Sequence, residues 1–98
     1  MKLRLSPTAG RQIAEFVAWW DAHRRDARIR VEDAFEAAVS ALVEHPELGP
    51  TYSRDSRYRT WRLKGTPYVR FYRVDRPADT IRVVVAWSAQ RGMGPNLP

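Results

Sequence analysis

Cysteine is absent from the 98 residues, so the chain can form neither a disulfide nor a thiolate-based metal or catalytic site. No apolar run approaches the ~18 residues that a membrane-spanning helix needs, and Met1–Pro7 lacks the apolar segment of a secretion signal. From these absences we expect a cytoplasmic protein without a membrane segment. The length suffices for one compact domain and is short for two, so we predict a single domain over residues 1–98.

Acidic residues are also missing from one part of the chain. Between Ser56 and Val74 there are six basic residues and no Asp or Glu. The six are Arg57, Arg59, Arg62, Lys64, Arg70 and Arg73. Over the whole chain, 17 Lys and Arg stand against 11 Asp and Glu, a net charge of +6. This uneven distribution predicts an anionic partner, either a nucleic acid or an acidic protein segment, and leaves the choice between them open.

Residues 57–91 contain three runs in which apolar and polar side chains alternate, with Gly-Thr-Pro and Arg-Pro-Ala-Asp turn signals between them. The pattern predicts three antiparallel strands, in which alternate residues face opposite sides. We expect one apolar face, formed by Trp61, Leu63, Val69, Phe71, Ile81, Val83, Val85 and Trp87. The other face is expected to collect Arg62, Lys64, Tyr68, Arg70, Tyr72 and Arg82. This second face is the candidate functional surface.

The residues before these runs predict one short strand and two helices. Residues 2–5 alternate as a strand does, and their polar side would add two cations to the functional surface if the strand joins the sheet. Ser6 and Pro7 are typical of a helix start. Apolar residues then recur at helical spacing as far as His45, with a break near residues 22–27. The expected fold is α+β in the order β-α-α-β-β-β: an N-terminal strand, an antiparallel two-helix hairpin and a three-stranded antiparallel sheet whose apolar face the hairpin covers.

Four short motifs accompany this order of elements. They are Leu-Ser-Pro before the first helix, Glu-His-Pro-Glu-Leu-Gly at residues 44–49, Tyr-x-x-Phe-Tyr-Arg-Val at 68–74 and Val-Ala-Trp-Ser-Ala-Gln-Arg-Gly at 85–92. Together they resemble the RelE/ParE superfamily of toxins from type II toxin-antitoxin systems, over essentially the whole chain. The resemblance implies a small bacterial toxin of the kind that arrests growth and serves plasmid stabilisation, encoded beside an antitoxin that wraps and silences it.

The superfamily implies two alternative activities. RelE-like members cleave messenger RNA on the ribosome with basic residues, whereas ParE-like members inhibit DNA gyrase and are not known as nucleases. Arg62 and Lys64 match the paired sheet cations and Arg91 lies near the C-terminal arginine, so these three would be the catalytic residues of a nuclease. Val69 and Ser88, however, stand where nuclease relatives carry an arginine and a histidine. Because RNA cleavage needs a proton donor and acceptor, we favour the ParE-like branch.

Residue roles follow from this resemblance and from the predicted faces. The expected target-binding residues are Arg62, Lys64, Tyr68, Arg70, Tyr72, Arg82 and Arg91. Trp19, one position off the apolar stripe of its helix, is assigned to antitoxin binding together with Arg4 and Arg70. The two tyrosines either pack across strands or stack on bases. The expected partners are a cognate antitoxin and DNA gyrase, with the ribosome and messenger RNA as the alternative target. A second alternative function is that of a generic nucleic-acid-binding domain. We expect no metal and no cofactor, because the sequence has no metal-ligand spacing or phosphate-binding loop.

Overall fold

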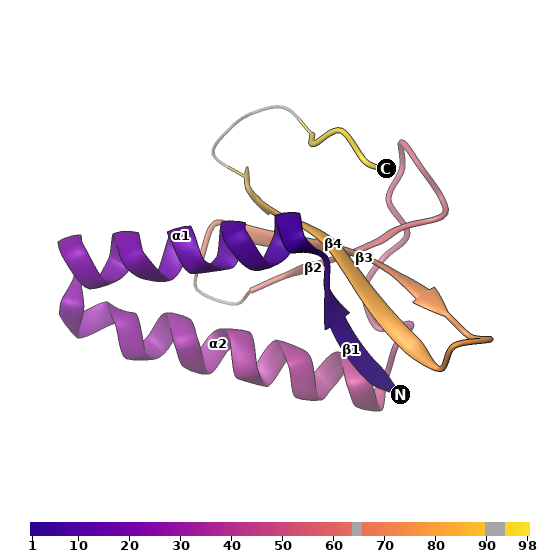
Figure 1. The fold of residues 1–98 in the computed structure, drawn as a ribbon, viewed down its shortest axis with the longest axis horizontal. Helices are drawn as coiled ribbons and strands as arrows, with labels where there is room; N and C mark the ends of the chain where they lie inside the picture. The colour runs from indigo at the N-terminus through magenta and orange to yellow at the C-terminus, as the bar shows by residue number, and fades with distance from the viewer. Residues whose placement is uncertain (64–65, 90–93) are drawn as a thin grey trace.

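The computed structural model describes residues 1–63, 66–89 and 94–98, with the side chains of residues 25–31 left out of the description. Two helices and four strands follow one another in the predicted order (Figure 1). They are β1 (Lys2–Leu5), α1 (Pro7–His23), α2 (Arg25–Glu44), β2 (Arg59–Arg62), β3 (Tyr68–Asp75) and β4 (Thr80–Ser88). The α+β architecture is therefore confirmed.

The four strands form one sheet in the order β1-β4-β3-β2. The pairs β2–β3 and β3–β4 are antiparallel, as the alternating runs predicted. Strand β1 joins the sheet beside β4 and runs parallel to it, so the sheet is mixed and not strictly antiparallel. Both helices and two strands separate β1 from β4 in the sequence, which leaves enough chain for the crossover that a parallel pair needs.

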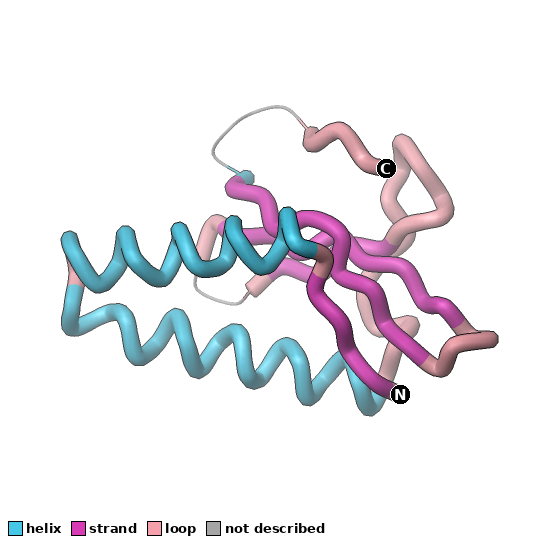
Figure 2. The backbone as a smooth tube through the Cα atoms, viewed as in Figure 1, coloured by secondary structure: helices cyan, strands magenta, loops and turns pink. Residues whose placement is uncertain are grey.

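The two helices lie side by side and form a hairpin over one face of the sheet (Figures 1 and 2). They join at Arg24, inside the predicted break. The joined end extends past the strands, so the molecule is elongated, with extents of 40 × 28 × 22 Å. No helix within the described ranges has the length and apolar character to cross a membrane.

Side chains at the start of α1 fix the hairpin to β4. The Ser6 hydroxyl accepts a hydrogen bond from the amide of Ala9 at 3.0 Å, which confirms Ser6 as the helix cap. The same hydroxyl donates to the backbone oxygen of Val84 at 2.7 Å. One turn further, the Gln12 side chain accepts from the amide of Ala86 at 2.9 Å. These bonds satisfy backbone groups of β4 beyond the point where β1 ends, so α1 covers a sheet edge that would otherwise be open.

A β-bulge in β4 changes which residues share a face. Phe71 pairs with Val85 and Tyr72 pairs with Val83, so Val84 has no partner in the ladder. A bulge of this kind shifts the alternation of the strand by one residue. Ile81 and Val83 therefore face the helices, whereas Val85 and Trp87 face the opposite side. The expected placement of Val85 and Trp87 on the helix-covered face is wrong for this reason. The expected placement of Val69 and Phe71 there is also wrong, because the register of β2 and β3 puts Arg70 beside Trp61 and leaves Val69 and Phe71 on the other side.

Apolar side chains are buried on both faces of the sheet. Under the helices, two clusters contain Ala9, Leu42, Tyr72, Ile81 and Val83, and Phe35, Ala38, Leu63 and Tyr68. On the other side, called the outer face from here on, a third cluster contains Tyr58, Phe71, Val84 and Val85. The outer cluster is covered by Tyr52 from the loop before β2 and by Leu97 from the C-terminal segment 94–98. The expectation of an open, polar far face is thus corrected, because a second, smaller core occupies its centre.

Candidate target- and partner-binding surface

Tyr68, expected on the open face, lies in the core beneath the helices. Its residue is 7% exposed, and its ring stacks on Phe16 with 4.0 Å between centroids. The indole nitrogen of Trp20 donates to the Tyr68 hydroxyl at 2.6 Å. The ring and the hydroxyl are both engaged within the fold, so Tyr68 is not placed to stack on a base.

Tyr72 is completely buried and holds the loop after α2 against the sheet. Its hydroxyl accepts from the amide of Gly49 at 3.0 Å and donates to the backbone oxygen of Pro46 at 2.9 Å. A Cβ atom at position 49 would lie 2.2 Å from the backbone oxygen of Thr60, which explains the glycine. Burial raises the pKa of the Tyr72 phenol. The motifs at residues 44–49 and 68–74 are therefore joined by hydrogen bonds of the Tyr72 hydroxyl. The predicted placement of Tyr72 on the open face is wrong.

Arg70 is the third residue that lies under the helices. It is 3% exposed and its guanidinium carbon lies 4.8 Å from the centre of the Phe35 ring. Its Nε and Nη1 atoms have no hydrogen-bond partner among the described residues. Burial lowers the pKa of Arg70 to about 10, so the side chain is still a cation at neutral pH. The ring face compensates part of the lost hydration. Arg70 is not accessible to a target or an antitoxin in this conformation.

The exposed cations lie at two ends of the outer face. Arg62, at the end of β2, is exposed near one end, and Arg82 lies on β4 near the other. Lys64 and Arg91, which complete the predicted site, fall outside the described residues. The cations that the structure describes are thus divided between two places.

Arg82 is paired with an acid. Its Nε donates to Asp75 at 2.9 Å, and this bond, followed by one from the amide of Ala78, lowers the pKa of the Asp75 carboxyl. Asp75 follows the acid-free stretch directly and lies on the same side of the sheet as Arg82. The expected absence of acids from this face is therefore wrong.

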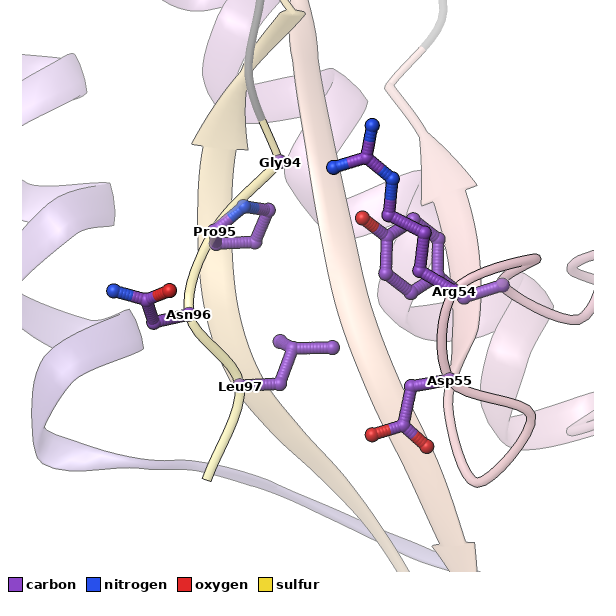
Figure 3. Close-up of a pocket in the computed structure, with 7 residues that line it drawn as sticks. Arg54, Asp55, Gly94, Pro95, Asn96 and Leu97 are labelled. Carbon is purple, nitrogen blue, oxygen red and sulfur yellow. The ribbon is translucent and has the colours of Figure 1, made fainter.

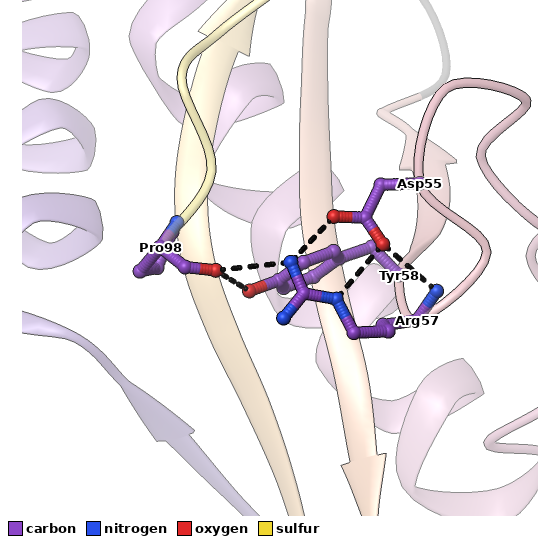
Figure 4. A network of polar contacts seen from close by, with 4 residues as sticks. All are labelled: Asp55, Arg57, Tyr58 and Pro98. Atoms are coloured by element: carbon purple, nitrogen blue, oxygen red, sulfur yellow. Dashed lines mark hydrogen bonds and ion pairs between the residues drawn. The ribbon is translucent and has the colours of Figure 1, made fainter.

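Sequence reasoning missed the loop and C-terminal segment that cover the outer face. Arg57 binds Asp55 through Nε and Nη2 at 3.0 and 2.6 Å, and this contact lowers the pKa of Asp55 (Figure 4). The Tyr58 hydroxyl donates to the backbone oxygen of Pro98 at 2.6 Å. Between the loop and the C-terminal segment lies a hollow of about 530 Å³, with Leu97 turned into it (Figure 3). The only signal was the alternation of arginine and tyrosine at residues 57–59, which reads equally as the start of a strand.

Trp19 provides an exposed apolar surface on α1. It is 49% exposed, stacks on the His23 ring at 4.5 Å and meets Trp20 edge to face at 5.1 Å. It borders a hollow of about 430 Å³ lined by Glu15, Phe16, Trp19, Trp20, Pro67, Tyr68 and Ser88. The hollow is mostly apolar, and it opens where the hairpin meets the start of β3.

A family model for the ParE toxin of the type II toxin-antitoxin system parDE matches residues 3–92. The chain belongs to the ParE toxin family. Two solved structures share its fold: a chromosomal ParDE system from P. aeruginosa, at TM-score 0.73, and a YoeB/ParE toxin from Agrobacterium tumefaciens, at 0.59. Their sequence identities are 16% and 14%, over 90% of this chain and 95% and 98% of theirs. No curated protein sequence matches the chain.

The outer face of this ParE-family chain carries guanidinium groups, carboxylates and a tyrosine hydroxyl. Its carboxylates, Asp55 and Asp75, are ion-paired with arginines, and Tyr58 is buried with its hydroxyl engaged. Both histidines belong to the hairpin, His23 in α1 and His45 at the end of α2. The described ranges contain no group of three residues that could hold a metal ion. Guanidinium groups on this face can bind phosphate or carboxylate groups.

Proposed function

We propose that this chain is a toxin that inhibits DNA gyrase, arrests growth and is neutralised by a cognate antitoxin. The observation that carries the proposal is the match of residues 3–92 to the ParE toxin model, which begins within β1 and spans every later helix and strand. The shared fold with a chain from a chromosomal ParDE system is consistent with it.

The positions of the two tyrosines favour gyrase over messenger RNA as the target. A nuclease of the RelE type needs groups that deprotonate the 2′-hydroxyl and protonate the leaving oxygen. Tyr68 and Tyr72 were expected on the open face, but their hydroxyls are bonded to Trp20 and to Pro46 inside the fold and are not free to exchange protons with a message. What remains of the predicted site is a set of cations, which supports binding.

We assign target binding to Arg62 and Arg82, which the structure describes, and to Lys64 and Arg91. Tyr68, Arg70 and Tyr72 leave the assignment because their side chains are buried. The exposed Trp19 patch and Arg4 remain the candidate antitoxin contacts. Arg70 leaves this set too, for the same reason.

The direct test adds purified protein to DNA gyrase and relaxed plasmid, and in parallel to ribosomes translating a defined message. We expect loss of supercoiling, an intact message, and recovery of supercoiling when the antitoxin is added. Arg62→Ala should weaken inhibition, whereas Arg11→Ala, an exposed arginine of α1, should not. Unchanged supercoiling at high molar excess contradicts the proposal, and codon-specific cleavage of the message would establish the RelE-like alternative.

A second test separates antitoxin binding from toxicity. Trp19→Ser should weaken antitoxin binding about tenfold or more, as expected when a tryptophan is removed from the centre of an interface, and should leave gyrase inhibition unchanged. Leu48→Ser is the matched control, because Leu48 is similarly exposed, at 46%, in the loop after α2. Equal effects of both substitutions would place the antitoxin elsewhere.

A further inference from the structure

Three arginines lie side by side across the sheet. Arg82 on β4 is directly opposite Arg73 on β3, and on its other side it is paired with Arg4 on β1. Neighbouring strands are ~4.8 Å apart, so the three Cα atoms form a row about 10 Å long. We call Arg4, Arg82 and Arg73 the arginine row.

All three side chains of the row belong to the outer face. On β1, Leu3 packs into the core under the helices, so its neighbour Arg4 faces the other way. On β3, Arg73 lines a hollow with Tyr58 and Val84 of the outer cluster, together with Arg57 and Pro98. On β4, Arg82 bonds Asp75, which lies two residues from Arg73 on the same side of β3. The row is therefore one continuous feature that crosses three strands.

Such a row costs stability. Like charges directly opposite one another on neighbouring strands repel, by roughly the amount that favourable cross-strand pairs contribute. Asp75 offsets one of the three charges through the Nε of Arg82, and no described residue bonds the two terminal nitrogens of that guanidinium. Arg4 and Arg73 are exposed; Asp75 also attracts Arg73 electrostatically, but no ion pair is described for Arg73 or Arg4. The row thus keeps a net positive charge on the outer face.

We propose that the arginine row binds the phosphodiester backbone of a nucleic acid. Guanidinium groups form paired hydrogen bonds with phosphate oxygens, and a row of this length can face about two or three consecutive phosphates. The hollow of about 450 Å³ between Arg73 and Arg57 continues the row and has room for a further phosphate or sugar. The site lies at the opposite end of the face from Arg62; it shares Arg82 with the proposed gyrase surface and Arg4 with the proposed antitoxin contacts, and its test needs neither partner.

The surroundings of the row favour a nucleic acid over an acidic protein segment. A protein partner usually anchors itself on exposed apolar or aromatic side chains, with charges at the rim. The large apolar side chains exposed in the described chain are Leu5, Trp19 and Leu48. Leu5 alternates with Arg4 and so faces away from the row, Trp19 is on α1, and Leu48 is in the loop after α2. The row therefore offers regularly spaced charge without an apolar anchor, which matches a regular polyanion.

The test measures binding of a short fluorescent DNA duplex, and of a single-stranded RNA of similar length, to the purified protein without gyrase. With three phosphate contacts, affinity for the duplex should fall about fortyfold between about 50 and 200 mM salt. Arg73→Gln should reduce this dependence to about twelvefold, because it removes one contact. Binding of the RNA with a salt dependence of about eighteenfold, the smaller value expected for three contacts to a single strand, supports recognition of the backbone.

Arg11→Gln is the matched control, since Arg11 is also exposed and its replacement removes the same charge from α1. We expect it to leave the salt dependence near that of the parent protein. An equal loss for Arg11→Gln and Arg73→Gln would show diffuse attraction and overturn the site. Absence of binding at low salt, or equally strong binding of an acidic peptide of the same charge, would also overturn it. Because gyrase is not in the assay, these outcomes leave the proposed inhibition to its own test.

Discussion

The helix-covered face of the sheet buries Arg70 among aromatic and apolar side chains, whereas the outer face leaves Arg4 and Arg73 exposed to a ligand. Both faces nevertheless have an apolar cluster. The difference shows that the number of cations on a strand does not identify the binding face. The buried Arg70 packs against the Phe35 ring, whereas the strand register brings the exposed Arg4 and Arg73 to either side of Arg82.

The largest effect should come from testing whether the outer cluster is a true core. Phe71→Ala on the outer face and Leu42→Ala under the helices should each lower the free energy of unfolding by about 2–5 kcal/mol, because each empties a buried site. Urea denaturation followed by circular dichroism measures both. An effect of Phe71→Ala near zero, beside a normal effect of Leu42→Ala, would mean that the loop and C-terminal segment do not cover the outer face.

Local signals predicted most of the architecture. Ser6 begins α1, the helices break at Arg24 and the three later strands pair as expected, because capping, helical periodicity and turn residues act over a few neighbours. The end of β4 was assigned to the wrong face because the bulge at Val84 depends on the pairing of two strands. Strand β3 was assigned wrongly because alternation alone does not show which of its two sets of side chains shares a face with Trp61. Nothing in the Ile81–Trp87 run distinguishes a shifted alternation from a regular one.

The prediction of the site was wrong mainly for polar side chains that the fold buries. Tyr68 and Tyr72 read as surface residues beside Arg70, yet each hydroxyl finds a partner 26 or more residues away in sequence. Such partners become visible only when the hairpin and the loop after α2 are placed. Arg62, which is exposed, and Arg82, which is half-buried, were by contrast assigned to the correct side, because their strands alternate regularly over the few residues concerned.

The second prediction addresses the buried cation. Arg70→Leu should raise the free energy of unfolding by about 1–4 kcal/mol at neutral pH, because it removes a charge whose Nε and Nη1 have no partner in the described chain. The sign follows from the pKa: burial lowers it to about 10, so the folded state disfavours the protonated form at every lower pH. Arg73→Gln, on the exposed side of the same strand, should change stability by less than about 0.5 kcal/mol. A destabilised Arg70→Leu protein would mean that the guanidinium has a bonded partner.

The third prediction concerns the hydroxyl that links β3 to the loop after α2. Tyr72→Phe should lower the free energy of unfolding by about 1–3 kcal/mol, since the Gly49 amide loses its acceptor inside the fold. Burial raises the pKa of Tyr72, so its contribution is complete below the ordinary phenol pKa of 10.0 and is lost as pH rises through the folded value. Unfolding curves between neutral and strongly alkaline pH should therefore converge for Tyr72→Phe and the parent protein. Parallel curves would mean that another group controls alkaline unfolding.

The smallest expected effect is on duplex binding, and it tests whether charge beside the arginine row matters more than net charge. Asp75→Asn should strengthen duplex binding by about threefold, the change expected when one repulsion at roughly 6 Å in water is removed. Arg82 lowers the pKa of Asp75, so the stability from this contact is present above pH 3.8 and disappears as pH falls through the folded value; the variant should lose that acid dependence. Asp33→Asn, on the exposed surface of α2, removes the same charge far from the arginine row and should leave duplex binding unchanged. If both substitutions strengthen binding equally, net charge controls the interaction; if only Asp75→Asn does, the strand register that brings Arg4, Arg82 and Arg73 together controls it.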